Sequence, residues 1–421
     1  MSSNATSNDS YNNGDVAWVL ASTCLVWLMI PGIAFVYGGM SRRNSTLSSL
    51  MVCSLAIPIV SIQWILFGYS ITFSNTGGRF IGNLKDALFI NDLDETISHQ
   101  SGQNQYYEKI PKLTHAVFQL MFAAITPSII FGSVSGRIRT IPALIFLFIW
   151  STLVYDFIAY WCWSDHGWLN EWGVLDFAGG TPVHISSGAA ALAYCLVVRR
   201  NSGRFHPHDT TKVILGTVFL WFGWFGFNGG SALGANLRAT MACIVTNTAA
   251  SAGGLTWMFI EYFKMPVGER RLSAVGFCSG ALAGLVAITP GSGFVTPYAA
   301  LIFGLLSGAI CKLATEQNFY RDENEVFAIH GVGGIIGNIL TGVFADQRIA
   351  MLNNQMIDGG AIDGNGIQVL KQLVSCAVGF SWSFIVTGII LLIMSKIWDM
   401  EINDFNRVDD ENHVQSAYND N

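Results

Sequence analysis

Asp176-Phe-Ala-Gly-Gly-Thr-Pro-Val-His184-Ile-Ser-Ser-Gly188 and Phe327-Ala-Ile-His330-Gly-Val-Gly-Gly334 are the two stretches of sequence that decide the fold. Each places one histidine within an apolar segment long enough to cross a bilayer. An ionisable side chain at membrane depth is costly, so it indicates a functional site. Small residues around both histidines allow helices to pack closely. We therefore predict a narrow passage in which two imidazole rings handle a proton or a small polar solute.

The composition is that of a membrane protein. Of the 421 residues, 51% are hydrophobic and 12% are charged, whereas a soluble domain carries about 25% charged residues. The net charge of −6 and the lack of a basic arm argue against nucleic acid as a partner. The eight cysteines lie mostly in apolar segments without a CxxC pair. We interpret them as small core residues rather than a disulfide or zinc framework.

Eleven apolar segments are candidates for membrane-spanning helices, since one crossing requires about 20 mostly apolar residues. Their approximate ranges are 15–40, 48–73, 113–135, 141–163, 179–198, 212–230, 240–263, 272–289, 294–314, 326–345 and 371–398. The segments 272–289 and 326–345 are glycine-rich and weaker, as expected of helices surrounded by other helices. The sequence thus predicts an all-α polytopic membrane protein with an N-terminal segment 1–14, a transmembrane domain 15–398 and a short tail 399–421.

The positions of lysine and arginine predict the orientation. If the N-terminus is outside, 15 of the 22 Lys and Arg residues lie on the cytoplasmic side, as the positive-inside rule requires. An odd number of spans then places the C-terminus in the cytoplasm. Asn4-Ala-Thr6 and Asn8-Asp-Ser10 are N-glycosylation sequons on the predicted extracellular terminus, although such short motifs also arise by chance. We take Asn4 as the candidate glycosylation site.

Landmarks of the first five spans recur in the next five. Ala124-Ile-Thr-Pro127 in the third span is repeated as Ala287-Ile-Thr-Pro290 in the eighth, and the His184 and His330 stretches occupy the fifth and tenth. Because five is odd, the two halves must cross the membrane in opposite directions, as in inverted-repeat transporters. We therefore expect a five-plus-five inverted repeat followed by a final long helix, with the two histidines meeting near the membrane midplane.

The histidine pair has more than one explanation. Each ring could be satisfied separately by backbone carbonyls, although equivalent positions in two repeats weaken this explanation. A metal site is disfavoured, because two imidazoles lack the third and fourth ligands that zinc requires. Two neutral imidazoles bonded to each other offer a donor at one end and an acceptor at the other. A pKa near neutrality also makes histidine suited to proton transfer.

Aromatic and polar residues near the predicted outer end form a second candidate group. The aromatic members are Phe118, Phe122, Trp163, Trp221, Trp224 and Phe227. They are explained either by ordinary packing with an interfacial belt or by a cation–π box above rings that close a path. Ser231 could add a hydroxyl acceptor. Asp176 lies where a helix N-cap belongs, and a purely structural cap is at least as well supported as direct solute contact. We favour a mixed role, in which Asp176 orders the vestibule and biases cation entry electrostatically.

These motifs resemble the ammonium transporter family, which includes the fungal methylammonium permeases and the Rh proteins. The stretch from Asp176 to Gly188 is similar to the family signature. Further stretches that match in order are Pro31-Gly-Ile-Ala-Phe-Val-Tyr-Gly-Gly39, Trp224-Phe-Gly-Phe-Asn-Gly-Gly-Ser231, Val275-Gly-Phe-Cys-Ser-Gly280 and His330-Gly-Val-Gly-Gly334. The likeness covers roughly residues 15 to 400 and is greatest to a fungal high-affinity ammonium permease. The tail is shorter than is usual in the family, which puts tail-dependent regulation in doubt.

The resemblance implies a homotrimer in the plasma membrane, with an ammonium and methylammonium pore through each eleven-helix protomer. By motif, Phe122, Trp163 and Ser231 correspond to the outer ammonium site, and Asp176 corresponds to the acid near it. Trp163 is the least secure of these correspondences because Trp161 is close.

By the same resemblance, Phe122 and Phe227 would form a phenylalanine gate, and His184 and His330 would be the paired histidines of a hydrophobic pore. We expect NH4+ to be recruited and deprotonated, after which NH3 and H+ pass along the pore. A bare cation in an apolar passage meets a large desolvation penalty. Potassium meets the same penalty and cannot shed a proton, so it would be excluded.

Two other functions fit the same residues. One is a passive ammonia or gas channel without net charge movement, and the other is an ammonium sensor. An enzyme is disfavoured, because the sequence contains no nucleophile with a base and no phosphate-binding loop. We expect no cofactor, and we expect membrane lipid and ammonium as partners.

Overall fold

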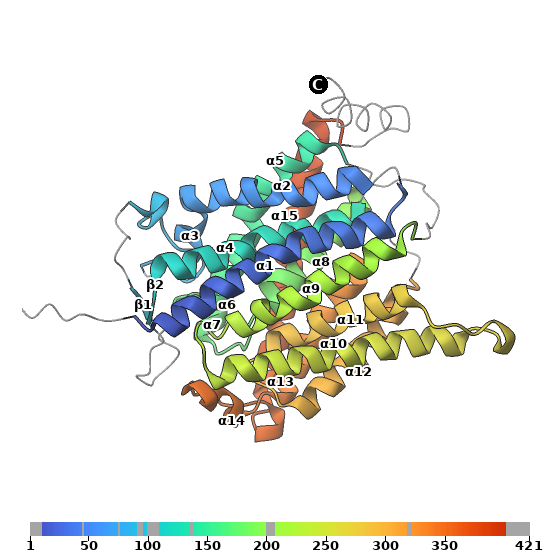
Figure 1. The fold of residues 1–421 in the computed structure, drawn as a ribbon. Helices are drawn as coiled ribbons and strands as arrows, with labels where there is room; N and C mark the ends of the chain where they lie inside the picture. The colour runs from blue at the N-terminus through green and yellow to red at the C-terminus, as the bar shows by residue number, and fades with distance from the viewer. Residues whose placement is uncertain are drawn as a thin grey trace, which may run out of the picture.

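The computed structural model describes residues 11–43, 46–74, 76–90, 96–98, 109–134, 138–198, 207–317 and 322–400. In this part of the chain, long helices pack side by side in one bundle (Figure 1). The elements that form its spans are α1 (Asn13–Met40), α2 (Thr46–Gln63), η2 (Trp64–Gly68), α3 (Tyr69–Phe73), α4 (Lys112–Ile130), η4 (Phe131–Val134), α5 (Thr140–Trp150), η5 (Ser151–Tyr155), α6 (Asp156–Trp163), η6 (Gly180–Ile185), α8 (Ser186–Val197), α9 (Thr210–Gly230), α10 (Leu237–Lys264), α11 (Ala274–Ile288), η8 (Thr289–Gly291), α12 (Pro297–Ala314), η9 (Phe327–Val332), α13 (Gly333–Phe344) and α15 (Ile367–Ile397). The predicted all-α membrane architecture is confirmed.

Each of the eleven predicted spans corresponds to one continuous helical segment of the described chain. Nine helices there are long and apolar enough to cross a membrane. The other two segments are α10, which carries Thr, Ser and Asn side chains along its length, and η6–α8, which is buried from Gly180 to Cys195. The segments around 272–289 and 326–345, predicted as weaker, are among the nine.

Short elements connect the spans. They include α7 (Trp168–Glu171), α14 (Gln347–Ala350) and the antiparallel strands β1 (Thr96–Ser98) and β2 (Lys109–Pro111). The sequence analysis did not predict the strand pair, because each strand has only three residues. It lies at the end of the bundle where α1 begins, which we call the N-terminal face (Figure 1).

The first spans of the two halves, α1 and α9, pack against each other in opposite directions. Gly39 at the end of α1 meets Val213 near the start of α9, and Gly230 at the end of α9 meets Ser22 in the first half of α1. The glycines allow the two backbones to approach, as is common between membrane helices. Antiparallel packing of equivalent spans is the arrangement that an inverted repeat requires.

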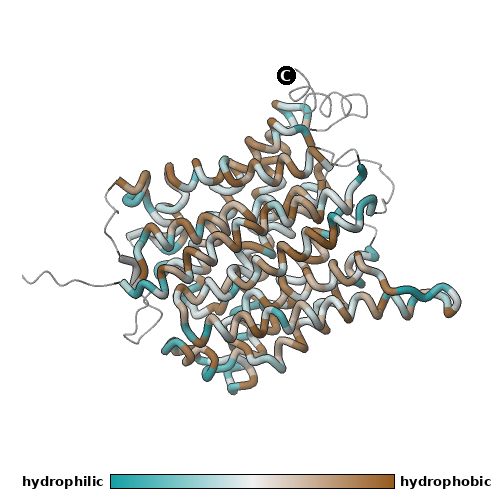
Figure 2. Tube along the Cα trace, in the orientation of Figure 1, coloured by the Kyte–Doolittle hydropathy of each residue, from teal (hydrophilic) through white to brown (hydrophobic). Residues whose placement is uncertain are grey.

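Apolar side chains are exposed around the sides of the bundle. Phe222, Leu305 and Ile393 are 50–55% exposed, and hydrophilic residues gather toward the ends (Figure 2). In water, contiguous apolar surface of this extent marks an interaction site. Here it fits contact with the hydrocarbon of a bilayer.

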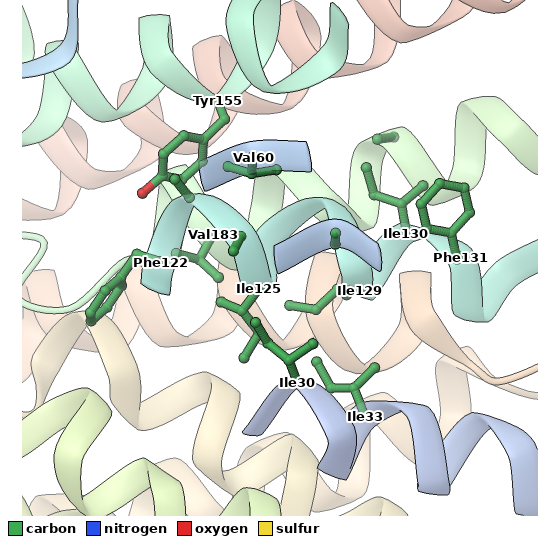
Figure 3. Close-up of a cluster of buried hydrophobic side chains, with 14 of the residues drawn as sticks. Ile30, Ile33, Val60, Phe122, Ile125, Ile129, Ile130, Phe131, Tyr155 and Val183 are labelled. Carbon is green, nitrogen blue, oxygen red and sulfur yellow. The ribbon is translucent and has the colours of Figure 1, made fainter. Parts of the chain in front are cut away.

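An apolar core fills the space between α1, α4 and η6. Ile30 and Ile33 of α1 lie next to Ile125 and Ile129 of α4, with Val183 of η6 behind them (Figure 3). All five side chains are almost completely buried. Because Val183 directly precedes His184, this packing holds the first histidine stretch in a dry environment.

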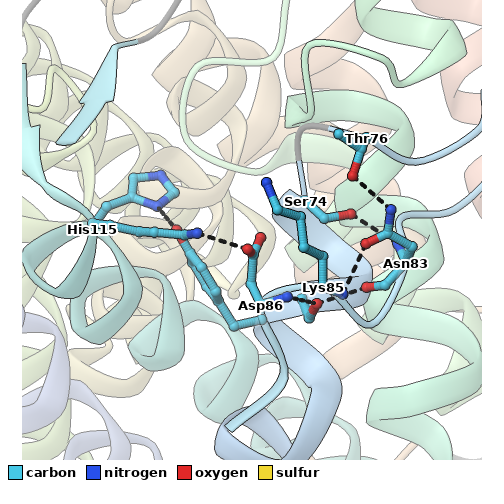
Figure 4. A network of polar contacts seen from close by, with 9 residues as sticks. Ser74, Thr76, Asn83, Lys85, Asp86 and His115 are labelled. Atoms are coloured by element: carbon cyan, nitrogen blue, oxygen red, sulfur yellow. Dashed lines mark hydrogen bonds and ion pairs between the residues drawn. The ribbon is translucent and has the colours of Figure 1, made fainter. Parts of the chain in front are cut away.

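A polar network fixes the described segment 76–90 to the N-terminal face (Figure 4). Asp86 and Lys112 form a buried ion pair of 2.9 Å. The Ser70 hydroxyl accepts a hydrogen bond from the Asp86 backbone N–H and donates to the carbonyl of Asn83. Pairing is required here, because removing one partner of a buried ion pair is strongly destabilising.

Candidate functional site

A cavity of about 950 Å³ lies at the N-terminal face and brings four predicted residues together. Phe122, Trp163, Asp176 and Ser231 all contribute to its lining. They come from α4, the end of α6, the loop before η6 and the C-cap of α9. Residues from four separate parts of the sequence therefore line one space.

Charged side chains of both signs also line this cavity. They are Asp165, Glu171, Asp358, Arg238 and Lys371. The Arg238 guanidinium lies 4.6 Å from the ring centroid of Phe177 and 4.7 Å from that of Phe294, and its Nε donates to the carbonyl of Gly293 (2.7 Å). These contacts hold its positive charge against the cavity wall. Sequence analysis did not include Arg238 among the candidate residues, so it missed this position.

Two phenylalanine rings separate the cavity from a second, narrower one. The centroids of Phe122 and Phe227 are 4.3 Å apart, and both side chains are almost completely buried. Phe122 borders the large cavity, and Phe227 borders the narrow one. Trp163 packs edge-on against Phe122 at 5.9 Å, and its indole N–H donates to the carbonyl of Asp176 (3.0 Å).

The narrow cavity has a volume of only about 20 Å³, and its lining is mostly apolar. Besides Phe227 it is lined by Met29, Ile33, Val36, Tyr37, Ile125, Ile129, His184, Leu220, Trp224, Leu282 and His330. The Tyr37 hydroxyl donates to the carbonyl of Ile129 (3.0 Å). His184 and His330 thus bring titratable imidazole groups into an otherwise mostly apolar cavity.

The imidazoles of His184 and His330 contact each other. Their Nδ1 atoms are 3.2 Å apart, and their ring centroids are 5.3 Å apart. Both rings are buried, and both belong to π-helical segments, η6 and η9. A Cβ on Gly188 would lie 2.3 Å from the Cα of Gly331, so only glycine there allows the two segments to cross this closely. The two histidines, one from each repeat, are therefore in direct contact, as expected.

Hydrogen bonds around Thr289 determine which nitrogen of His184 carries the proton. The Thr289 hydroxyl accepts from the indole N–H of Trp224 (3.0 Å) and donates to the carbonyl of Leu285 (2.8 Å). A lone pair is then what Thr289 offers to Nε2 of His184, 3.4 Å away. The indole N–H of Trp224 can only donate, and the proton of the Thr289 hydroxyl is used for Leu285, so the Thr289 oxygen can only accept from His184. Nε2 of His184 is therefore the protonated nitrogen, and its Nδ1 accepts from Nδ1 of His330.

Comparison with known proteins places this arrangement in a family. The model of the ammonium transporter family matches residues 17–418. The chain belongs to the ammonium transporter family. It is 48% identical to ammonium transporter 1 of Schizosaccharomyces pombe over 402 residues, which are 93% of this chain and 78% of that protein.

Solved structures of ammonium transporters share the fold. The crystal structure of Candida albicans Mep2 has a TM-score of 0.86 and 38% identity, covering 95% of this chain and 88% of that chain. A structure described as a sensor Amt protein has a TM-score of 0.81 and 28% identity, covering 94% and 96%. The named relatives are transporters, so the chain is a membrane transporter and not an enzyme.

In this ammonium transporter, Asp176 caps η6. Its Oδ1 accepts from the backbone N–H of Gly179 (2.8 Å) and Gly180 (2.7 Å), and its Oδ2 accepts from that of Thr181 (2.7 Å). Gly179 has φ +115°, a conformation that favours glycine. Burial raises the pKa of the Asp176 carboxyl, and the three N–H donors oppose this effect. Asp176 thus both caps η6 and lines the large cavity.

The structure also distinguishes the positions of tryptophan residues that the sequence left ambiguous. Trp163 lines the large cavity, whereas the indole N–H of Trp161 donates to the carbonyl of Phe80 (2.7 Å). Trp221 packs near Phe277, at a lateral cavity between α9, α10 and α11. The Asn4 sequon and the tail beyond residue 400 lie outside the described residues.

Proposed function

We propose that this transporter takes up ammonium across the plasma membrane by recruiting NH4+ at the large cavity, deprotonating it and passing NH3 and H+ along the histidine pair. The observation that carries the proposal is the direct contact of His184 and His330 (Nδ1 to Nδ1, 3.2 Å) in an apolar passage. Methylammonium would be carried in the same way, since it also has a proton to release.

Recruitment would use the aromatic and polar wall of the large cavity. The rings of Phe122 and Trp163 offer π faces to a small cation. The Ser231 hydroxyl donates to the carbonyl of Phe227 (2.8 Å), so its oxygen retains lone pairs to accept from an ammonium N–H. The Asp176 carboxylate adds a negative charge near the base of the cavity. Together these groups replace part of the hydration shell of NH4+.

Deprotonation would occur where the cation meets the closed rings of Phe122 and Phe227. Beyond them the passage is too small and apolar for a hydrated ion, and an unpaired charge there is strongly disfavoured. Loss of a proton turns NH4+ into a neutral molecule that can pass between the rings when they part. Potassium has no such route, so selectivity follows from proton chemistry rather than from diameter.

The proton would then cross through the two imidazoles. In the resting arrangement His330 Nδ1 donates to His184 Nδ1, which leaves Nε2 of His330 as the acceptor of the pair. A proton gained at one end and released at the other inverts both tautomers. Thr289 would favour their return, because it offers a lone pair to Nε2 of His184.

We further propose that the N-terminal face is extracellular, that the C-terminus is cytoplasmic and that the protein is a homotrimer with Asn4 glycosylated. The excess of Lys and Arg on the opposite side of the predicted topology supports the orientation. The family resemblance supports the trimer, in which each protomer keeps its own pore. Labelling of introduced cysteines from either side of the membrane tests the orientation directly.

Ammonium sensing is the second candidate function. It is favoured by the similarity of the chain to a solved structure described as a sensor Amt protein. Sensing and transport can share one binding cavity, since both begin with capture of the cation. A signalling response that survives loss of uptake would support sensing.

The decisive test is to reconstitute the purified protein in liposomes and record ammonium-evoked current together with internal pH. Transport with net charge should give an inward current, driven by about 2.3 kcal/mol per charge per 100 mV. A passive gas channel should instead make the lumen alkaline without current.

His184→Ala and His330→Ala should reduce methylammonium uptake or allow potassium to compete. His166→Gln, at an exposed histidine, is the control. Undiminished and selective uptake in both alanine variants would contradict the relay.

A further inference from the structure

An acidic side chain that the proposed pore does not use lies within the fourth span. Asp156 is completely buried, and its Oδ2 is 2.6 Å from Nε2 of Gln63, a completely buried residue of the second span. Nε2 of Gln63 also donates to the hydroxyl of Thr152 (3.2 Å). A carboxyl and an amide therefore join two membrane helices at depth. Neither residue lines the large or the narrow cavity.

Four buried polar atoms in this region have no hydrogen-bond partner within the described part of the chain. They are Gln63 Oε1, Ser151 Oγ, Tyr155 OH and Asp156 Oδ1. All four side chains are completely buried, and three of them lie within six consecutive residues. Because buried polar atoms are nearly always paired, such a group indicates an additional ligand. A buried water molecule typically bonds two to four such groups.

The backbone of both helices is adapted to the pair. The π-helical segment η2 begins directly after Gln63, and the π-helical segment η5 ends directly before Asp156. Such wide turns are frequent at functional sites, and η6 and η9 carry the two pore histidines in the same way. A Cβ on Gly68 would lie 2.5 Å from Gln63 Oε1, so this glycine makes room for the amide.

The pair of Gln63 and Asp156 has no counterpart in the second half of the inverted repeat. Spans seven and nine, α10 and α12, are the counterparts of spans two and four. Their charged residues lie near the helix ends: Arg238, Glu261, Lys264 and Lys312. The second half thus completes the same fold without a buried acid at depth. Gln63 and Asp156 are therefore an addition to the first half rather than a condition of folding.

We propose that Gln63, Ser151, Tyr155 and Asp156 form a second polar site within the membrane, whose ligands are a proton on Asp156 and resident water. Among the described residues no Lys, Arg or His forms an ion pair with Asp156. An unpaired carboxylate in this environment is strongly disfavoured relative to the neutral acid. The proposal does not depend on how ammonium crosses the pore.

The hydrogen bonds assign the proton of the site to Oδ1 of Asp156. Oδ2 already accepts from the Nε2 amide of Gln63 (2.6 Å), whereas Oδ1 has no partner in the described part of the chain. The Asp156 O–H would therefore donate to a resident water molecule. Water then bonds the remaining polar atoms of Ser151 and Tyr155. The site stores one exchangeable proton between the second and fourth spans.

Infrared spectroscopy of the purified protein in lipid at neutral pH tests the site. The wild type should show the carbonyl stretch of protonated carboxylic acids, and Asp156→Asn should lose the component of this band that comes from Asp156. This variant keeps the shape and hydrogen-bonding capacity of the side chain, so methylammonium uptake should persist. Asp209→Asn, at a carboxylate outside the spans, is the matched control and should retain the band. Gln63→Leu should shift the band, because it removes the amide that donates to Oδ2 of Asp156, and it serves as the readout if Asp156→Asn does not fold.

Exchange into heavy water distinguishes the two ligands. The Asp156 component of the wild-type band should shift within the exchange time of internal water, and an unshifted component would overturn the water component of the proposal. A wild-type band that Asp156→Asn leaves unchanged would overturn the proton component. A sodium-dependent rise in the unfolding temperature of the wild type but not of Asp156→Asn would identify a metal cation in place of the proton and also overturn the proposal.

Discussion

Thr289 is expected to set the tautomer of His184, and Thr289→Val removes this constraint with little change in volume. The Thr289 hydroxyl accepts from Trp224 and donates to the carbonyl of Leu285, which leaves a lone pair for His184 Nε2. For His184 to present an unprotonated Nε2, Thr289 must give up its bond to Leu285. One hydrogen bond contributes about 1 kcal/mol net, so we expect roughly a five-fold preference for the Nε2-protonated tautomer.

In Thr289→Val this preference should fall toward equal populations. The valine also leaves the buried indole N–H of Trp224 without its acceptor, which should lower the free energy of unfolding by about 1–3 kcal/mol. Imidazole nitrogen NMR shifts of the histidine-labelled protein in membranes measure the tautomer ratio, and thermal unfolding measures the stability. Methylammonium uptake should fall, because the relay no longer returns to one resting state.

Thr126→Val is the matched control, because Thr126 is the repeat counterpart of Thr289. Its buried hydroxyl donates to the carbonyl of Phe122 one turn earlier in the same helix (2.7 Å). Thr289→Ser should keep the wild-type tautomer ratio, since it keeps the hydroxyl. An unchanged ratio in Thr289→Val would refute the reasoning, and so would an equal change in Thr126→Val.

Two further variants test the packing and the charges around the pore. Gly188→Ala places a Cβ against the backbone of Gly331, so the histidine segments must separate; we expect uptake to be lost and the free energy of unfolding to fall by about 1–3 kcal/mol. Glu325→Gln tests pH dependence: burial raises the pKa of Glu325 from 4.5 to about 7, although Lys312 opposes this. Between these values the folded state binds more protons than the unfolded state, so the stability of the wild type should fall as pH rises, by roughly 2 kcal/mol after allowance for partial exposure. Thermal unfolding at a series of pH values should show a flatter profile for Glu325→Gln.

Each of these two variants has a control at a position that is uncrowded or exposed to solvent. Gly366→Ala adds a Cβ where no atom lies within 4 Å, so it should leave stability and uptake unchanged. Glu269→Gln removes an exposed acid and should keep the wild-type pH profile. Normal uptake in Gly188→Ala would show that the close crossing is not needed. A steep pH profile that persists in Glu325→Gln would assign the titration to another group.

The fold could be predicted from the sequence because a bilayer restricts the chain to few solutions. Runs of about 20 apolar residues must be helices, since no water satisfies their backbone within hydrocarbon. The shared order of Ala124-Ile-Thr-Pro127 and Ala287-Ile-Thr-Pro290 then indicated the repeat. The convergence of His184 and His330 followed from that symmetry alone. These features needed only periodicity, composition and spacing.

The remaining parts of the site depend on contacts between distant residues. Thr289 was visible as a repeat landmark, but its bonds to Trp224 and His184 join three different spans. Arg238 was not a candidate in the sequence, because only the folded chain brings it onto the rings of Phe177 and Phe294. Asp156 was counted within an apolar span without a stated role. In each case the sequence shows the residue type, and only the packing shows its partner.

The distribution of π-helical turns connects the pore with the second polar site. In the described chain these turns occur in four spans, and each turn carries or adjoins a buried histidine, amide or carboxyl group. A wide turn weakens the helical hydrogen-bond ladder where the membrane offers no water as a substitute. The wide turn therefore lowers the stability of the span. Its presence indicates that the side-chain position it creates serves a function. The turns that carry His184 and His330 occupy equivalent positions in both halves, whereas those next to Gln63 and Asp156 occur in the first half alone. The pore thus follows from the duplicated architecture, and the acidic site is a separate feature that the duplication does not explain.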